Sequence, residues 1–120
     1  MTLRLWTIDV DAADPQKLGH WWADALGWKV FYDRANEFVI TTEDERFPGL
    51  VFLKVPEAKA GKNRLHLDLV PDDQEAEVLR LRSIGATEVD IGQSGSESWV
   101  VMADPEGNEF CVLRAREGGM

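Results

Sequence analysis

Polar and apolar residues alternate along residues 3–11, which makes this stretch the first predicted strand. A period of two places successive side chains on opposite faces of a strand, so one face is apolar and the other is polar. The polar face carries Thr7, Asp9 and Asp11. The pattern therefore predicts a half-buried strand that presents a hydroxyl group and two carboxylates in one row.

A helical period follows this strand. Apolar residues recur at spacings of three and four, which places them on one broad stripe of a helix: Leu18, Trp21, Trp22, Ala25 and Leu26. Asp14 and Pro15 are typical of a helix N-cap and first turn, and Gly27 is typical of a C-terminal cap. Three more strands are predicted after this helix, at residues 28–33, 37–42 and 50–55.

The same order of elements begins again after a short polar linker at residues 56–62. A strand at residues 63–70 precedes a helix that Asp72 or Asp73 caps and that runs to about Ile84, before Gly85. The remaining predicted features are strands at 86–91, 98–102 and 110–114, a Gly/Ser loop at 92–96, a Pro/Gly turn at 104–108 and a frayed tail at 117–120. The second half thus repeats the order strand, helix and three strands.

The two halves also align residue by residue. A shift of 59 residues superimposes polar positions of one half on those of the other: Thr7 on His66, Asp9 on Asp68 and Asp14 on Asp73. We therefore predict an α+β fold in which two tandem βαβββ modules, residues 1–56 and 62–116, form a single domain over residues 1–120. Their strands would form a curved mixed sheet around a cavity, with the helices on the outer faces.

The length, net charge and cysteine count of the chain limit the classes of binding partner and the cellular compartment. A chain of 120 residues is long enough for one domain with a core of its own. Its net charge of −9 argues against nucleic acid or an anionic membrane surface, because both attract clustered Lys and Arg. The chain shows no charged-then-apolar leader and no long apolar run, and its single cysteine fits a reducing compartment. We therefore expect a cytoplasmic protein.

The strand predicted at residues 63–70 carries the most informative polar row. Leu65, Leu67 and Leu69 would face the core, and the opposite face would present Arg64, His66 and Asp68. An imidazole among carboxylates suits a proton shuttle or an anion binder, although a histidine on a strand can equally be a structural residue. If Asp9 and Asp68 face each other across the cavity, two close carboxylates tend to share a proton, which supplies a general acid or base.

Four further residues are candidates for lining a ligand-binding site: Thr7, Arg64, Trp99 and Cys111. Cys111 lies between Phe110 and Val112 and fits a small core residue better than a nucleophile, because no helix N-terminus or lysine stands beside it to activate the thiol. The strand pattern around Trp99 leaves open which face this side chain occupies.

Several motifs resemble the glyoxalase-like, or vicinal-oxygen-chelate (VOC), superfamily, which also holds bleomycin-resistance proteins and extradiol dioxygenases. They are Asp14-Pro15 with Trp21-Trp22, the ALGW run at 25–28, the KNRLHLDL run at 62–69, the stretch from Leu81 to Gly85-Ala86 and the DPEGNEFC run at 104–111. The resemblance covers nearly the whole chain. It implies the two-module fold, a small organic molecule as the partner and a homodimer.

The resemblance also locates the metal positions of the superfamily. Its metal-dependent members use a His or Gln, a Glu, a His and a Glu, one each from the first, fourth, fifth and eighth strands. On this sequence those positions fall on Thr7, near Phe52 or Leu53, on His66 and on Cys111. Only His66 matches, so we predict that the ordinary metal site is lost and assign no cofactor. If a divalent metal such as Zn²⁺ is bound, His66 and Cys111 would be ligands, with Asp9 or Asp68 as a third.

Three functions fit these observations. The preferred hypothesis is a glyoxalase-like protein that binds a small molecule and performs metal-independent acid–base chemistry, of lyase or isomerase type, at His66, Asp68 and Asp9. The first alternative is a drug-sequestering protein of the bleomycin-resistance type. The second alternative is a metal-dependent VOC enzyme with an atypical ligand set. The sequence alone leaves open whether the chain is an enzyme.

Overall fold

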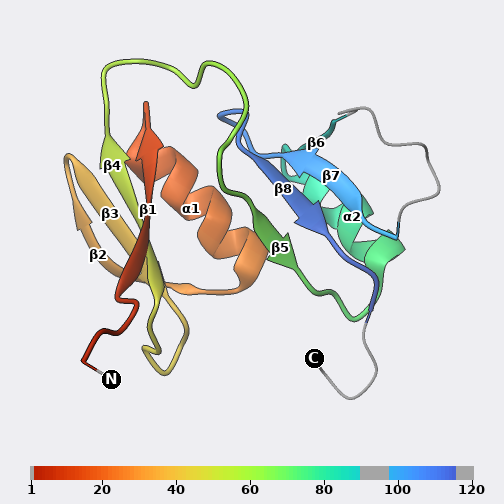
Figure 1. The fold of residues 1–120 in the computed structure, drawn as a ribbon, viewed down its shortest axis with the longest axis horizontal. Helices are drawn as coiled ribbons and strands as arrows, with labels where there is room; N and C mark the ends of the chain where they lie inside the picture. Colours follow the sequence, from red (N-terminus) through yellow and green to blue (C-terminus); the bar gives the residue numbers. More distant parts are fainter. Residues whose placement is uncertain (1, 90–97, 116–120) are drawn as a thin grey trace. The chain divides into compact units, whose positions relative to one another are not determined.

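The computed structural model describes residues 2–89 and 98–115 of the chain, which forms two compact units, Met1–Ala58 and Lys59–Met120. Each unit contains one helix and one four-stranded sheet (Figure 1). The elements are, in order, β1 (Thr7–Ala12), α1 (Pro15–Leu26), β2 (Lys29–Arg34), β3 (Glu37–Thr41), β4 (Gly49–Lys54), β5 (Leu67–Leu69), α2 (Gln74–Ser83), β6 (Thr87–Glu88), β7 (Val100–Ala103) and β8 (Glu109–Val112). The predicted α+β class and the repeated βαβββ order are confirmed.

The first unit is a mixed sheet covered by α1. Its strand order is β1-β4-β3-β2, in which β1 is parallel to β4 and the other pairs are antiparallel. Phe38 and Phe52 are register partners, and Phe52 is in turn the partner of Val10 on β1. The Phe38 ring lies against α1, because a Cβ atom added at Gly19 would come within 2.1 Å of it. Asp9 alternates with Val10, so it points to the face opposite α1.

The capping signals of α1 are confirmed. The Asp14 carboxylate accepts a hydrogen bond of 3.1 Å from the backbone N–H of Lys17, and Pro15 occupies the first helical position. Gly27 ends the helix with a φ of 69°, a left-handed conformation that glycine adopts at no steric cost. These local interactions fix both ends of the helix that covers the first sheet.

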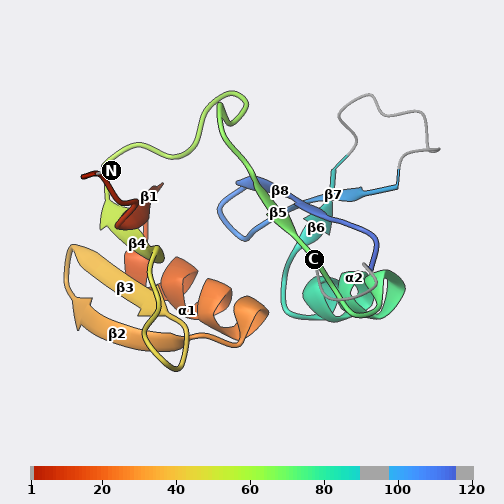
Figure 2. The ribbon, with the colours of Figure 1, turned by 60° about the horizontal axis from the view of Figure 1, so that its bottom comes forward.

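The second unit repeats the same topology. Its strand order is β5-β8-β7-β6, with β5 parallel to β8 and the other pairs antiparallel. Asp73, rather than Asp72, caps α2, since its carboxylate accepts a hydrogen bond of 3.1 Å from the backbone N–H of Ala76. Figure 2 shows α2 along one face of this sheet. Strand order and direction therefore match between the units, element for element.

The strand predicted at residues 63–70 was too long. β5 contains only Leu67–Leu69, and the side chain of Leu65 is 85% exposed, so the prediction that it faces the core was wrong. The physical reason is a contact with a distant part of the chain: the backbone N–H of Asn63 donates to the side chain of Glu109 rather than to a backbone carbonyl. The ladder with β8 consequently begins at Leu67, and His66 stands just before it.

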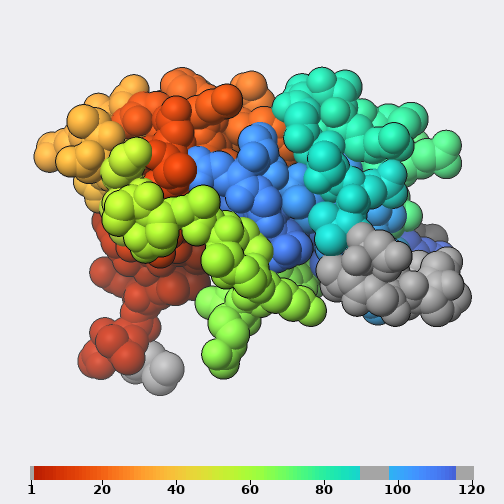
Figure 3. Space-filling model, turned by 90° about the horizontal axis from the view of Figure 1, so that it is seen from above, coloured from red at the N-terminus to blue at the C-terminus, as the bar shows by residue number. Residues whose placement is uncertain are grey.

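Several other predicted segments lie partly or wholly outside the residues that the structure describes. The strand predicted at 86–91 is observed as the two residues of β6, while residues 90–91, the Gly/Ser loop at 92–96 and the tail at 117–120 lie outside the described residues. Residues 56–62, the predicted linker, lie on the molecular surface (Figure 3). Among the residues that the structure describes, no helix is both long enough and apolar enough to cross a membrane.

Candidate functional site

His66 and Asp68 form a close pair at the start of β5. The Nε2 atom of His66 lies 3.2 Å from Oδ1 of Asp68, so a protonated imidazole there forms an ion pair with the carboxylate. The two side chains are 54% and 52% exposed, respectively. Residues two apart on an extended chain point to the same side, which explains the contact. A small molecule in solution can therefore reach both groups.

Cys111 lies beside this pair on the neighbouring strand. It is the register partner of Asp68 and is buried, with 8% of its surface exposed. Burial raises the pKa of the Cys111 thiol, as do the negative charge of Asp68 and the hydrogen bond that Asp68 accepts from it. Cys111 is thus a protonated thiol rather than an activated nucleophile, as the sequence indicated.

Trp99 and Arg64 are the other candidate site residues of the second unit. Trp99 directly precedes β7, whose Val101 is the register partner of Cys111. Trp99 itself lies in a bend outside the ladder, so the register of β7 does not set the face that its side chain occupies. Its side chain is 42% exposed. Arg64 is exposed and lies two residues before His66.

Thr7 and Asp9 occupy the equivalent places in the first unit. The hydroxyl of Thr7 donates a hydrogen bond of 2.8 Å to Oδ1 of Asp9. The register partner of Asp9 on β4 is Val51, where the second unit has Cys111. The predicted pairing of Asp9 with Asp68 across a cavity stays a prediction.

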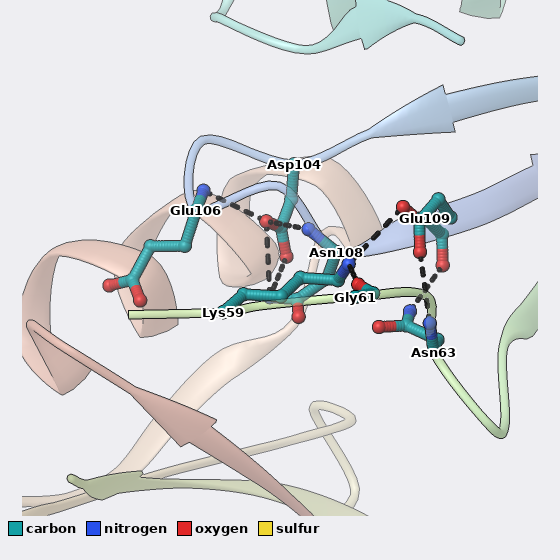
Figure 4. A network of polar contacts seen from close by, with 7 residues as sticks. All are labelled: Lys59, Gly61, Asn63, Asp104, Glu106, Asn108 and Glu109. Atoms are coloured by element: carbon teal, nitrogen blue, oxygen red, sulfur yellow. Dashed lines mark hydrogen bonds and ion pairs between the residues drawn. The ribbon is translucent and has the colours of Figure 1, made fainter. Parts of the chain in front are cut away.

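A polar network that was not predicted from the sequence surrounds Glu109 (Figure 4). The Nζ atom of Lys59 lies 3.3 Å from Oε2 of Glu109, and the backbone N–H of Asn63 donates to Oε1 over 3.3 Å. The Asn63 amide also donates a bond of 3.1 Å to the backbone carbonyl of Glu109. The period of two along β8 could have predicted Glu109 at the site, because it places Glu109 on the same face of the strand as Cys111. Lys59 gave no such signal, because residues 56–62 were predicted to be a linker.

The network lowers the pKa of Glu109. Partial burial acts in the opposite direction, but the hydrogen bonds donated by the Asn63 backbone and the Lys59 ammonium group outweigh it, so the pKa falls below its ordinary value of 4.5. Glu109 is therefore a carboxylate at neutral pH. It anchors the segment that leads to His66.

The predicted turn at residues 104–108 is confirmed, and it directly precedes Glu109, the first residue of β8. The buried carboxylate of Asp104 accepts hydrogen bonds from the backbone N–H groups of Glu106 and Asn108, at 2.9 and 3.0 Å, and from the Asn108 side chain. Gly107 adopts a φ of 90°, which a residue with a side chain rarely adopts. The turn thus fixes where β8 begins (Figure 4).

The second unit contains a set of side chains that could hold a metal ion. The donor atoms of His66, Asp68 and Cys111 all lie within 4.8 Å of one another. Imidazole, carboxylate and thiolate are the donors that Zn²⁺ accepts in proteins, so these residues fit such an ion. A cation there would also offset the repulsion between Asp68 and an ionised Cys111. The position near Phe52 supplies no ligand, because that phenylalanine is fully buried and apolar.

Comparisons with known proteins agree with this architecture. Residues 7–113 match the family profile described as a glyoxalase-like domain. The fold is similar to that of a glyoxalase/bleomycin resistance protein/dioxygenase family enzyme from Burkholderia phytofirmans PsJN, with a TM-score of 0.73 and 17% identity, covering 95% of this chain and 100% of the other. A comparison with curated proteins finds no match.

Two further solved structures show the same fold. The bleomycin resistance determinant encoded on the transposon Tn5 has a TM-score of 0.62 and 16% identity, over 95% of this chain and 99% of the other. The oxidase ChaP-H2 has a TM-score of 0.68 and 19% identity, over 99% of this chain and 98% of the other. At these sequence identities the similarity shows the fold alone. The two proteins are named for different functions, so the shared fold does not indicate one function.

Proposed function

Because the chain belongs to the glyoxalase-like domain family, we propose that it binds a small organic molecule and transfers protons on it with His66 and Asp68. The observation that carries this proposal is the 3.2 Å contact between His66 Nε2 and Asp68 Oδ1, on a pair that is half exposed. A general base needs a proton acceptor that substrate can reach and a neighbour that orients it. This pair supplies both.

The proposed mechanism gives each group a role. Asp68 holds the Nε2–H side of the ring, which leaves Nδ1 as the nitrogen not engaged by the carboxylate. Nδ1 would take a proton from the bound molecule, and Asp68 would stabilise the imidazolium that forms. Return of the same proton to another atom of the molecule gives an isomerisation, and its transfer to a leaving group gives an elimination. No external oxidant or reductant is needed.

Neighbouring residues would shape the binding site. The protonated thiol of Cys111 donates to Asp68 and so helps to orient the carboxylate toward the imidazole. Trp99 would offer a half-exposed aromatic surface, and Arg64 would offer a cation for an anionic substituent. The roles predicted for Asp9 and Thr7, the homodimer and the cytoplasmic location remain predictions.

Proton exchange with solvent tests this function directly. A panel of small ketones and hydroxyketones is incubated with the protein in D₂O, and deuterium incorporation is followed by proton NMR. Replacing a general base lowers such rates by about 10²- to 10⁴-fold, so His66→Ala is expected to abolish incorporation and Asp68→Asn to reduce it. The matched control is His20→Ala, which removes the only other histidine, an exposed side chain in α1. Exchange that survives in His66→Ala would disprove the proposal.

A metal-dependent enzyme is the second candidate, and the 4.8 Å cluster of donor atoms favours it. The protein is purified without chelator, its metal content is measured, and it is then titrated with Zn²⁺. Stoichiometric zinc that is lost in His66→Ala, Asp68→Asn and Cys111→Ser would replace the metal-free mechanism. Stabilisation by cationic aromatic compounds that persists in His66→Ala would instead favour a drug-sequestering protein.

A further inference from the structure

One side chain connects the segment before His66 to the strand that carries Cys111. Glu109 receives the Lys59 ammonium group at 3.3 Å and the backbone N–H of Asn63 at 3.3 Å on its two carboxylate oxygens. The Asn63 side chain donates to the backbone carbonyl of the same residue. The Lys59 and Glu109 side chains are each only 19% exposed, so water screens their charges less than it does on an open surface.

Backbone pairing alone does not determine where His66 lies. The ladder between β5 and β8 runs from Leu67, paired with Phe110, to Leu69, paired with Val112. His66 is outside this ladder, and Asn63 is held to Glu109 three residues earlier. The position of the imidazole therefore depends on a short segment fixed at one end by the strand and at the other end by Glu109.

The first unit shows that the fold itself does not require this carboxylate. The register place of Glu109 is occupied there by Gly49, the partner of Thr7. A Cβ atom at Gly49 would lie 2.8 Å from the carbonyl oxygen of Ile40, so no side chain fits. The segment before β1 is held instead by a backbone hydrogen bond from Gly49 to Trp6. In the part of the chain that the structure describes, this acidic anchor precedes His66 and has no counterpart at the equivalent place before Thr7.

We propose that Glu109, together with Lys59 and Asn63, forms a clamp that positions His66 against Asp68. Glu109 is a positioning residue: it acts through Asn63 on the backbone of the segment that carries the imidazole. The inference rests on the proposed function of His66, although the position of the ring can be measured without a substrate. The clamp would fix the ring so that Nε2, rather than Nδ1, faces the carboxylate.

Two variants separate the contributions of the clamp. Glu109→Gln keeps an oxygen that can accept the Asn63 bond but removes the charge opposite Lys59. Lys59→Met removes the ammonium group and keeps an unbranched side chain. The control is Glu45→Gln, which breaks the 2.8 Å ion pair with Lys29 in the first unit. Each of the three variants removes one ion pair, either Lys59–Glu109 or Lys29–Glu45. Thermal unfolding of each variant checks that it still folds.

The first measurement is the tautomeric state of the His66 imidazole. Nitrogen-15 NMR of the imidazole distinguishes the two neutral tautomers, and we expect the wild type and Glu45→Gln to hold one tautomer. Glu109→Gln and Lys59→Met should show a mixture, with amide hydrogen exchange at His66 and Leu67 accelerated by about tenfold, the equivalent of one charge-assisted hydrogen bond. An unchanged tautomer and unchanged exchange in both clamp variants would overturn the proposal.

The deuterium incorporation assay separates this inference from the function on which it rests. If the ring responds to Glu109→Gln but the wild type incorporates no deuterium, the clamp stands and the proposed function fails. If the wild type incorporates deuterium and Glu109→Gln alters neither the tautomer nor the rate, the function stands and the clamp is wrong. A clamp that acts through the ring predicts a parallel change in tautomer and rate.

Discussion

Thr7 and Asp9 on β1 occupy the places that His66 and Asp68 occupy in the second unit. In both units a polar side chain contacts the aspartate two residues later, at 2.8 Å in the first and at 3.2 Å in the second. The residue across from the aspartate is Val51 in one sheet and Cys111 in the other. The repeat thus preserves an aspartate with a polar neighbour, whereas the first unit has Thr7 and Val51 at the places of His66 and Cys111.

The units also differ in how much side-chain surface they bury. The strands of the first unit contain five or six residues each, and those of the second contain two to four. In α1 the buried residues include Leu18, Trp21 and Trp22, whereas α2 buries only Val78 and Leu81. Among the described residues, the second unit, which carries the candidate site, therefore has the shorter strands and the helix with fewer buried residues.

The largest expected effect concerns the core of the first unit. Phe38→Ala should lower the free energy of unfolding by about 3–5 kcal/mol, because the ring is fully buried and lies against Gly19 in α1. Urea denaturation measures the loss. Phe31→Ala, at a 40% exposed position of β2, is the matched control and should cost far less. Equal costs at the two positions would mean that α1 does not pack on Phe38 as described.

A smaller loss is expected when the contact between α1 and its sheet is overpacked. Gly19→Ala adds a Cβ atom that would lie 2.1 Å from the Phe38 ring, so the ring or the helix must move. Overpacking of this kind costs about 1–3 kcal/mol. The double variant Gly19→Ala with Phe38→Leu should recover part of that loss in the same denaturation assay. Strictly additive costs would show that the two residues do not touch.

The third test exchanges the residues that face the two aspartates. Cys111→Val and Val51→Cys each replace one small buried side chain by another, so each should change the unfolding free energy by less than about 1.5 kcal/mol. Thermal unfolding of the two variants measures this change. Reaction with a thiol reagent should be slow for the wild type, because burial and Asp68 raise the pKa of Cys111. A large loss of stability in Cys111→Val would mean that the thiol is structurally essential.

The smallest expected effect is a dependence of stability on pH that arises from Glu109 in the second unit. The pKa of Glu109 is lowered in the folded chain, so its contribution to stability is present above its ordinary value of 4.5 and is lost as the pH falls through the lowered value. The difference in melting temperature between wild type and Glu109→Gln should therefore be largest near neutral pH and shrink below pH 4.5. A difference that grows on acidification would contradict the assigned direction.

Much of the fold could be predicted because its signals are local. Asp14, Gly27 and Asp73 cap their helices through hydrogen bonds and dihedral angles within a few residues, and the turn at Asp104 is built in the same way. The extent of the strand near His66 could not be predicted, because the alternation of residues 63–70 is that of a strand. The side chain of Glu109 on β8, which is distant in sequence, accepts the hydrogen bond from Asn63. The ladder between β5 and β8 therefore begins only at Leu67.

By itself, the sequence determined the repeated order of strands and helices, the start of the first helix and the row of His66 with Asp68, since periodicity and capping act between residues close along the chain. Only the tertiary structure decided that Cys111 lies opposite Asp68 and that Glu109 holds Asn63. These facts follow from the register between strands that are distant in sequence, and register is set when the sheet assembles.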